Sequence, residues 1–480
     1  MESLALSPRA PRTGESYPFG REAIRVLILY SDIGEGHAAS ARGIAAQIAQ
    51  KDPRVLTHLC NGFDALDPML RWLMRDLYQS QLFDHPWLYS GAYGVFKKLS
   101  QARSVGAAAM RISGARSCMR IISSYSPDLI VSTDPRVNVM LGYLRKKGRV
   151  HCPVCGVLTD FGGLEFWADR GLDRHFVMDE RLVSGVDTLI GKGGASAVLP
   201  PVDPRFFDPL SRSKARARLG MADDTPVILV SGGGWGVGDF EGALEIGLRV
   251  AGSHVICLAG RNEALHGRLT TLVRDRGLDA SRMQVLGFID HMDTLLAAAD
   301  VIVHSTAGVT CLEAMARHCP IIVYGAPPGH ALAAAVRMHD LGLATFTESS
   351  AELERALALV FATPGARSKT APVTAPMPSV ADAILSMRPV QLDALRVAPK
   401  PAALRGVASR EDTRNGSART EAKSRIVTRV GLGLAVAATA VVFLLSGHGL
   451  APVFSRGLHP AQPAVSASVQ PVAYRHIPIR

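Results

Sequence analysis

The sequence predicts an α/β protein with two parallel-sheet domains of similar size and a membrane-spanning helix near the carboxyl end. From residue 25 to residue 387, short β-branched segments alternate with helical segments rich in Ala, Leu and Arg. This alternation is typical of parallel strands joined by crossover helices. A proline-rich break at 200–204 divides the series into halves of about 180 residues. Beyond both halves lies an uncharged apolar segment at 430–446.

The composition is that of a globular protein with more than one core. The chain has 480 residues, of which 48% are hydrophobic and 20% charged, and its net charge is +11. A basic surface suits anionic lipid headgroups, phosphorylated substrates or nucleic acid. No basic patch with interleaved aromatic residues occurs, which argues against nucleic acid. The seven scattered cysteines favour reduced thiols in a reducing compartment.

The first half, residues 21–200, is expected to form one Rossmann-like domain after a disordered leader at 1–20. Its predicted strands are 26–30, 129–132, 154–158, 175–178 and 197–199. The stretch 66–99 is rich in aromatic residues and has two lysines beside it. It suits either a patch at a membrane interface or core helices of this domain.

A glycine turn follows the first predicted strand and carries Gly34, Glu35, Gly36 and His37 before a helix at 39–50. Ligands of open α/β sheets bind at the carboxyl ends of strands, and glycine lets the backbone approach a ligand closely. An imidazole there can act as a general base near neutral pH. The alternative is an ordinary strand–loop–helix joint with a surface histidine.

The second half, residues 201–388, is expected to form another Rossmann-like domain. Its predicted strands are 227–230, 254–258, 283–286, 301–304 and 321–324, and a helix at 381–387 closes it. Two such halves joined by a hinge suggest a ligand site between them.

A glycine-rich run follows the first strand of this second half and precedes a helix at 240–250. Its glycines can bring backbone N–H groups to an anion, and the helix N-terminus adds partial positive charge. These glycines are Gly233, Gly234, Gly236 and Gly238. A dinucleotide-binding turn is the rival interpretation, but the G-x-G-x-x-G spacing is not clean and no acidic residue ends the next strand.

Two further loops of ligand-binding type follow the strands at 301–304 and 321–324. The first contains Gly308, Val309 and Thr310, and Glu313 is expected on the first turn of the next helix. A carboxylate there can accept hydrogen bonds from two sugar hydroxyls, or it can simply be an acid stabilised by the helix dipole. The second loop contains Gly329 and His330. Three such loops on one sheet edge predict a phosphate- and sugar-binding site.

Taken together, these motifs resemble those of GT-B glycosyltransferases. The similarity is to the monogalactosyldiacylglycerol synthase and processive diacylglycerol glucosyltransferase group, which is related to the N-acetylglucosaminyltransferase of peptidoglycan synthesis. The segments that carry it are 31–37, 159–161, 166–167, 172–177, 201–206, 233–238, 287–292 and 308–314.

The resemblance implies a UDP-hexose donor held by the second half and a single displacement with inversion, without a metal or a cofactor. His37 matches the general base, Glu313 the ribose-binding carboxylate, and the glycine run the phosphate loop. The implied nucleotide-sugar-binding residues are Gly233, Gly234, Gly236, Gly238, Phe288, Ile289, Gly308, Val309, Thr310, Glu313, Gly329 and His330. The implied acceptor-side residues are Gly34, Glu35, Gly36 and Asp160.

Four positions depart from the family's pattern. Glu35 replaces a glycine beside the base, where it can orient His37, raise its pKa or obstruct a ligand. Leu164 stands at a frequent histidine, and His304 begins an altered entry to the ribose loop. His330 follows Pro-Gly where the family has an amide residue, which leaves the choice of hexose open.

The carboxyl end is expected to be a disordered basic linker at 389–428, a transmembrane helix at 429–447 and a disordered tail at 448–480. Lys423, Arg425 and Arg429 precede the apolar segment. By the positive-inside rule, both domains then lie on the cytoplasmic side of the cell membrane, held by a single span beside an anionic membrane surface.

The sequence thus predicts an inverting glycosyltransferase that moves a hexose from a UDP-sugar to a lipid acceptor such as diacylglycerol. A polyprenyl-linked or other acceptor is the first alternative. A non-catalytic nucleotide-sugar-binding protein and a nucleotide-sugar epimerase of related two-domain fold are the others.

Overall fold

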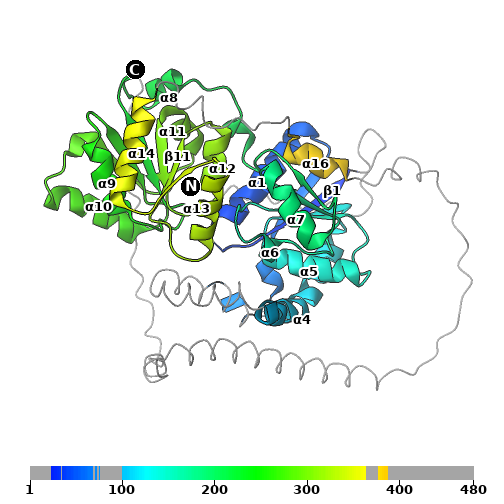
Figure 1. Ribbon diagram of the computed structural model, residues 1–480. Helices are drawn as coiled ribbons and strands as arrows, with labels where there is room; N and C mark the ends of the chain where they lie inside the picture. Colours follow the sequence, from blue (N-terminus) through cyan, green and yellow to red (C-terminus); the bar gives the residue numbers. More distant parts are fainter. Residues whose placement is uncertain are drawn as a thin grey trace, which may run out of the picture. The chain divides into compact units, whose positions relative to one another are not determined.

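Two parallel β-sheets form the framework of the protein (Figure 1). The structure is a computed structural model, and it describes residues 23–33, 35–66, 68, 71–72, 75, 100–363 and 377–387. The first sheet has the strand order β2-β1-β3-β4-β5-β6, and the second has the order β12-β11-β10-β7-β8-β9. Two Rossmann-like parallel-sheet domains are therefore confirmed, and they are consistent with a GT-B fold.

The first sheet is buried on both faces. Its strands are Arg25–Tyr30 (β1), Leu56–Asn61 (β2), Leu129–Ser132 (β3), Val154–Val157 (β4), Arg174–Val177 (β5) and Ala195–Ala197 (β6). Along β1, Val26 and Ile28 enter one hydrophobic core, while Leu27 and Leu29 enter another on the opposite face. A near-continuous apolar strand is what a parallel sheet with helices on both faces requires.

Helices join these strands in the usual crossover manner. They are Gly36–Lys51 (α1), Gly62–Ala65 (η1), Ser100–Tyr125 (α4), Pro135–Lys146 (α5), Leu164–Trp167 (α6), Glu180–Leu182 (η2) and Val183–Ile190 (α7). Because α1 begins at Gly36 rather than at residue 39, His37 lies in its first turn and not in the preceding loop.

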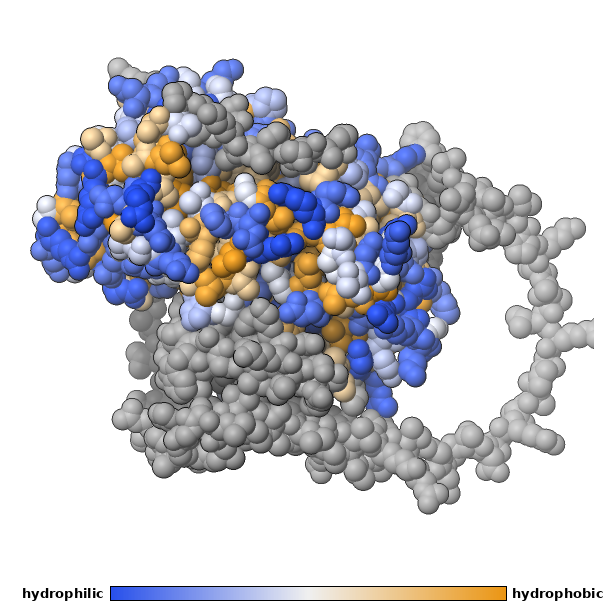
Figure 2. All heavy atoms as spheres, viewed as in Figure 1, coloured by the Kyte–Doolittle hydropathy of each residue, from blue (hydrophilic) through white to orange (hydrophobic). Residues whose placement is uncertain are grey.

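The second sheet repeats this construction. Its strands are Val227–Ser231 (β7), His254–Leu258 (β8), Met283–Leu286 (β9), Val301–His304 (β10), Ile321–Tyr324 (β11) and Thr345–Thr347 (β12). Its helices are Pro204–Phe206 (η3), Arg212–Arg218 (α8), Phe240–Arg249 (α9), Glu263–Asp275 (α10), Ala280–Arg282 (η4), Met292–Ala298 (α11), Val309–Ala316 (α12), His330–Asp340 (α13) and Ser350–Ala362 (α14). Figure 2 shows hydrophilic side chains over α9 and α10, as expected for helices that bury one stripe, here Leu265 and Leu269 of α10.

The last described helix, Val380–Ser386 (α16), packs against α1 of the first half (Figure 1). Lys51 Nζ lies 2.7 Å from Asp382 Oδ1. The Leu199 N–H donates to the Pro378 carbonyl over 2.9 Å. This differs from the expectation that the helix closes the second half, because the chain crosses back to the first domain before it ends.

The hinge between the halves is fixed to α1. Gln47 Nε2 donates to the carbonyls of Pro200 and Val202 over 3.1 and 2.7 Å. A β-carbon on Gly43 would lie 2.5 Å from the Pro200–Val202 segment, at the Pro201 carbonyl oxygen. Glycine at this position therefore allows the hinge to approach the helix.

Within the described ranges, no helix is both long enough and apolar enough to cross a membrane. The predicted leader, linker, transmembrane helix and tail fall outside those ranges, as does most of the aromatic stretch. Trp72, one described residue of that stretch, is 54% exposed.

Candidate active site

His37 is oriented by the loop that follows β3. Its Nδ1 lies 2.6 Å from the Thr133 carbonyl oxygen, and the Thr133 hydroxyl donates back to the His37 carbonyl over 3.0 Å. Because a carbonyl oxygen only accepts, Nδ1 must carry the proton in this contact. The lone pair of the neutral ring then lies on Nε2.

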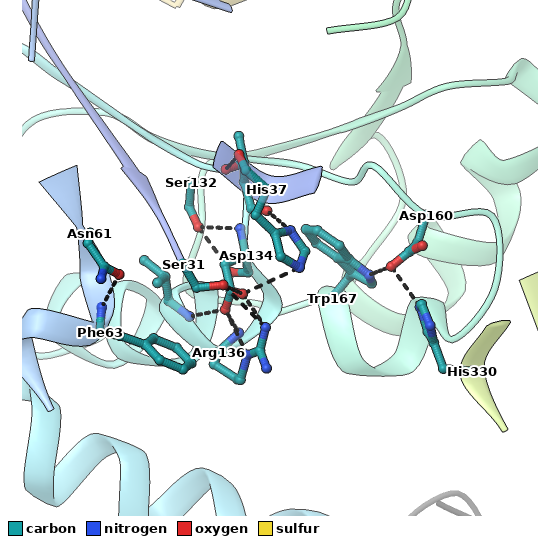
Figure 3. A network of polar contacts seen from close by, with 12 residues as sticks. Ser31, His37, Asn61, Phe63, Ser132, Asp134, Arg136, Asp160, Trp167 and His330 are labelled. Atoms are coloured by element: carbon teal, nitrogen blue, oxygen red, sulfur yellow. Dashed lines mark hydrogen bonds and ion pairs between the residues drawn. The ribbon is translucent and has the colours of Figure 1, made fainter. Parts of the chain in front are cut away.

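A buried carboxylate, Asp134, faces that nitrogen (Figure 3). Its Oδ2 lies 3.6 Å from His37 Nε2 and accepts a 2.6 Å hydrogen bond from the Ser31 hydroxyl. Asp134 also caps α5, since its Oδ1 accepts from the backbone N–H groups of Arg136 and Val137, and it pairs with the Arg136 guanidinium. A full set of donors keeps this carboxylate ionised and in place.

Burial and charge set the protonation states of this pair. Burial alone would raise the pKa of Asp134, but Arg136, His37 and Ser31 hold it well below its ordinary value. Burial lowers the pKa of His37, and Asp134 opposes that effect in part. His37 is therefore neutral near neutral pH, and a carboxylate is ready to stabilise its protonated form.

A ring contact from His37 to Trp167, followed by two polar contacts, leads from the candidate base to the second half (Figure 3). The Trp167 ring lies 5.7 Å from the His37 ring between centroids, and its Nε1 donates to Asp160 Oδ2 over 3.3 Å. His330 Nε2 lies 2.8 Å from the same Asp160 oxygen. The predicted acceptor-side Asp160, which follows β4, thus meets the predicted donor-side His330, the first residue of α13.

In the Asp160–His330 contact, each side chain favours the charged form of the other. Asp160 raises the pKa of His330 although burial opposes it. Burial would raise the pKa of Asp160, but His330 and Trp167 keep it below its ordinary value. The contact therefore joins the two halves as an ion pair whenever His330 is protonated.

The glycine run forms a compact turn after β7. The N–H of Gly236 donates to the Gly233 carbonyl over 3.1 Å, and the N–H of Val237 donates to the Gly232 carbonyl over 3.2 Å. Gly236 and Gly238 have φ angles of 62° and 121°, which favour glycine. The Ser305 hydroxyl donates to the Val237 carbonyl and so joins the turn to the loop after β10.

The turn that carries His37 lies directly against two donor-side segments, the glycine turn after β7 and the start of α12. A β-carbon on Gly234 would be 2.5 Å from Glu35 Cγ, and one on Gly36 would be 3.3 Å from Val309 Cγ2. Val309 begins α12, and Gly308 is its N-cap. Predicted acceptor-side and donor-side residues are therefore neighbours, although Gly34 itself is outside the described residues.

Glu35 pairs with the second half rather than with His37. Its Oε1 lies 3.0 Å from Arg261 Nε, and its Oε2 lies 3.8 Å from Arg42 Nη2. The Arg261 guanidinium lies 4.0 Å above the centre of the Phe288 ring, which is 52% exposed. Of the three roles considered for Glu35, these contacts do not support orientation of His37, because the Glu35 carboxylate is paired with Arg261 and Arg42 instead.

Glu313 lies on the second turn of α12, because the helix begins at Val309, and not on the first turn as expected. Stabilisation by the helix dipole is therefore a weak explanation for an acidic residue at this position, because the effect of the dipole falls off within the first turn. Burial raises the pKa of Glu313 to about 8, although Arg205 and Arg42 lower it. A protonated carboxyl group can both donate to and accept from a hydroxyl.

The remaining predicted residues lie at the carboxyl ends of strands in the second sheet, apart from Leu164, which follows β4 of the first sheet. Thr310 follows Val309 in α12, Gly329 precedes α13 with a φ of 99°, and Ile289 packs against the core. His304 is buried, accepts from the Thr306 N–H over 3.1 Å, and has a pKa lowered to about 4 by burial. Leu164 begins α6 and is partly buried.

Several residues of the site were missed by sequence reasoning. They are Thr133, Asp134, Arg136 and Arg261, together with Ser31 and Trp167, which lie in segments that carry the resemblance but were assigned no role. The available signal was Asp134-Pro135 directly after an apolar strand, since Asp at an N-cap followed by Pro at the first helical position marks a helix start.

No group of three or more His, Cys, Asp or Glu side chains suited to a metal occurs in the part of the chain that the structure describes. The predicted independence from metals and cofactors stays a prediction.

Two family models match the chain, one in each half. The model for monogalactosyldiacylglycerol (MGDG) synthase matches residues 37–188, and the model for glycosyl transferases group 1 matches residues 245–361. The first begins at His37, and the second includes Phe288, Val309, Glu313 and His330.

Known enzymes resemble the chain over about two thirds of its length. The processive diacylglycerol beta-glucosyltransferase of Bacillus subtilis (strain 168) is 24% identical over 336 residues, which are 68% of this chain and 85% of that protein. Monogalactosyldiacylglycerol synthase 1, chloroplastic, of Arabidopsis thaliana is 28% identical over 354 residues, which are 70% of this chain and 64% of that protein. The resemblance predicted from the motifs is confirmed.

Among solved structures, MurG of Acinetobacter baumannii aligns with 76% of this chain and 99% of its own, with 14% identity and a TM-score of 0.46.

Proposed function

We propose, on the premise that this chain is a glycosyltransferase similar to the diacylglycerol glycosyltransferases, that it moves a hexose from a UDP-sugar to a lipid acceptor such as diacylglycerol. The observation that carries the proposal is the position of the proton on the neutral His37 ring and the place of that ring beside the donor-side segments. Its Nδ1 proton is donated to the Thr133 carbonyl, and its Nε2, which faces Asp134 at 3.6 Å, carries the lone pair that can take a proton. The turn that carries His37 contacts the glycine turn and the start of α12.

The acceptor is activated by proton transfer to His37. As the acceptor hydroxyl oxygen attacks the anomeric carbon, its proton passes to Nε2. The imidazolium that forms lies 3.6 Å from the ionised Asp134, which stabilises it.

The donor occupies the second half. Its diphosphate lies at the glycine turn and at the start of α12, where backbone N–H groups and the helix dipole favour an anion. Glu313 binds the ribose hydroxyls. As the new bond forms, the bond from the anomeric carbon to the diphosphate oxygen breaks, and UDP leaves with the electron pair. One displacement inverts the anomeric configuration.

Membrane attachment belongs to the same proposal. The uncharged segment at 430–446 and the basic residues before it suit a single span with both domains on the cytoplasmic side. The net charge of +11 suits an anionic membrane surface. If the segment anchors the protein, a chain that ends at residue 428 will leave the membrane fraction, whereas the full chain will remain after a high-salt wash.

The proposal is tested by a donor screen with the full chain. UDP release is measured from several UDP-hexoses, with and without vesicles that contain diacylglycerol. We expect one donor to give release that the lipid stimulates, and about a 100-fold loss of this release in His37→Gln. His151→Gln, an exposed histidine outside the site, is the matched control.

Three other results are informative. If only a polyprenyl-linked acceptor stimulates UDP release, that acceptor replaces diacylglycerol in the proposal. If no acceptor stimulates UDP release, lipid glycosylation is contradicted. If His37→Gln transfers the hexose at the parent rate, His37 is not the general base.

A further inference from the structure

We propose that Arg261 binds the diphosphate of the nucleotide-sugar donor and that Glu35 competes with the diphosphate for Arg261. The inference rests on the proposed function, because it requires a nucleoside diphosphate at the glycine turn. It assigns a donor-side role to two residues that face each other across the halves of the protein.

The backbone of Arg261 is anchored on the glycine turn. Its N–H donates to the Gly234 carbonyl over 2.9 Å, and a β-carbon on the preceding Gly260 would lie 2.6 Å from that same oxygen. Asn262 Nδ2 donates to the Trp235 carbonyl over 3.2 Å. Since β7 and β8 are neighbours in the sheet, the loop after β8 lies directly beside the turn proposed for the diphosphate.

The guanidinium of Arg261 is oriented and accessible. It stacks on Phe288 at 4.0 Å and remains 58% exposed at the side chain. A planar guanidinium can bind two oxygens of a phosphate at once, and stacking on an aromatic ring orients it for this contact. Phe288 is itself among the predicted donor-binding residues.

The partner of Arg261 in this structure is an anion supplied by the protein. The Glu35 stem packs on Gly234, and its carboxylate lies 3.0 Å from Arg261 Nε. A donor diphosphate at the same turn would meet the negative charge of Glu35 and would need the same guanidinium. The pair is partly exposed, with Glu35 at 33%, so its exchange for a diphosphate costs little.

A second cationic side chain, that of Arg42, can pair with the Glu35 carboxylate in place of Arg261. Arg42 Nη2, on α1, lies 3.8 Å from Glu35 Oε2. When the diphosphate takes Arg261, the Glu35 carboxylate can move to Arg42 without losing all of its electrostatic stabilisation. The exchange needs only rotation of side chains on the existing backbone.

The test is calorimetric titration of UDP into the full chain, with uridine as the reference ligand that lacks phosphate. Glu35→Gln should bind UDP about fivefold more tightly, the upper end for release of a partly exposed ion pair. Arg261→Gln should bind UDP about tenfold more weakly. Uridine affinity should stay the same in both, and in an Arg261→Gln background the gain from Glu35→Gln should shrink.

Matched controls come from the exposed pair Arg249–Glu354, which has a 3.3 Å contact between α9 and α14. Glu354→Gln and Arg249→Gln make the same charge changes and should leave UDP affinity unchanged.

The possible outcomes separate this inference from the proposed function. If neither the parent chain nor Glu35→Gln binds UDP, the proposed function fails and the inference fails with it. If the parent chain binds UDP and Glu35→Gln binds it equally or more weakly, the competition is wrong while the function stands. A gain by Glu35→Gln that appears equally with uridine would show that Glu35 does not act on the diphosphate.

Discussion

At the scale of single residues, two opposing effects act on His37, the proposed base. Burial disfavours the imidazolium, which keeps the ring neutral and able to accept a proton. Asp134 favours the imidazolium, which lowers the energy of the state reached after proton transfer. The hydrogen bond to the Thr133 carbonyl keeps a proton on Nδ1, so Nε2 is the nitrogen proposed to accept the proton of the acceptor.

A prediction about pH follows from these shifts. Because the pKa of His37 lies below the ordinary 6.5, the acid limb of kcat against pH should lie below pH 6.5. In Asp134→Asn the imidazolium loses its carboxylate, so the limb should move to still lower pH while kcat falls about 100-fold. Steady-state transfer rates between pH 4.5 and 9 would measure both quantities.

The control for this variant is Asp179→Asn, since Asp179 also caps a helix and pairs with the arginine two residues later. It should keep the parent pH profile. A loss of rate in Asp134→Asn without movement of the acid limb would mean that Asp134 serves the fold of the loop and not the base.

The sequence could predict His37 because a strand, a glycine turn and a helix start are all local patterns. It could not predict the partners of His37, because Thr133 and Asp134 reach it across 96 and 97 residues of chain. Glu35 shows the same limit. Its departure from the family pattern was visible, but its contact with Arg261 depends on how two separate sheets meet.

At the scale of elements, the loop after β4 and the start of α13 are joined by Asp160 and His330. The two pKa shifts have opposite sign, as an ion pair requires. The stabilisation from His330 is complete below its ordinary pKa of 6.5 and is lost as the pH rises through its raised value. Asp160 stays ionised until the pH falls through its lowered value.

The stability effect of His330→Gln should therefore depend on pH. At pH 6 we expect the variant to be less stable than the parent by about 1–3 kcal/mol, the usual cost of losing a hydrogen bond to a charged group. The difference should shrink as the pH rises through the raised pKa of His330, because the parent histidine then loses its charge. Thermal unfolding at several pH values would measure this difference.

His291→Gln is the matched control, since His291 is an exposed histidine that lies 3.3 Å from Asp290. A difference between His330→Gln and the parent that is equally large at pH 6 and pH 9 would speak against a protonated His330.

The strands that the sequence predicted best are those whose residues form a continuous apolar run. Strands β1, β3, β7 and β10 are central or nearly so, and their sequences are dominated by Val, Ile and Leu. The strands that were missed, β2 and β12, each lie at one edge of a sheet, and polar residues such as His58 and Thr345 interrupt them, whereas strands were predicted at or beside the opposite edge strands, β6 and β9. An edge strand has one neighbour and less burial, so its sequence carries a weaker signal.

At the scale of the whole chain, α1 links the candidate base to the hinge. His37 lies in its first turn, and Gly43 and Gln47 contact the 200–202 segment farther along. The same helix meets α12 of the second half and α16 of the returning chain. The position of the base therefore depends on packing that involves both halves.

Gly43→Ala should disturb this arrangement, because its methyl group would lie 2.5 Å from the Pro201 carbonyl oxygen. We expect a loss of about 1–3 kcal/mol in unfolding free energy, as for other overpacked sites. Gly267→Ala in α10 is the control, since its β-carbon would meet nothing within 4 Å. That variant should be stabilised by about 0.5–1 kcal/mol, because alanine favours a helix over glycine.

Denaturant unfolding of the two variants would compare them directly. Equal stability of Gly43→Ala and the parent would mean that the hinge can move away from α1 without cost.

In the proposed reaction, a base from the first half and a donor held by the second half act in one displacement. The most direct measurement is the anomeric configuration of the glycolipid formed from a UDP-α-hexose and diacylglycerol, read from proton coupling constants by NMR. We expect a β-linked product, which His37→Gln does not form at an appreciable rate. An α-linked product would contradict the single displacement.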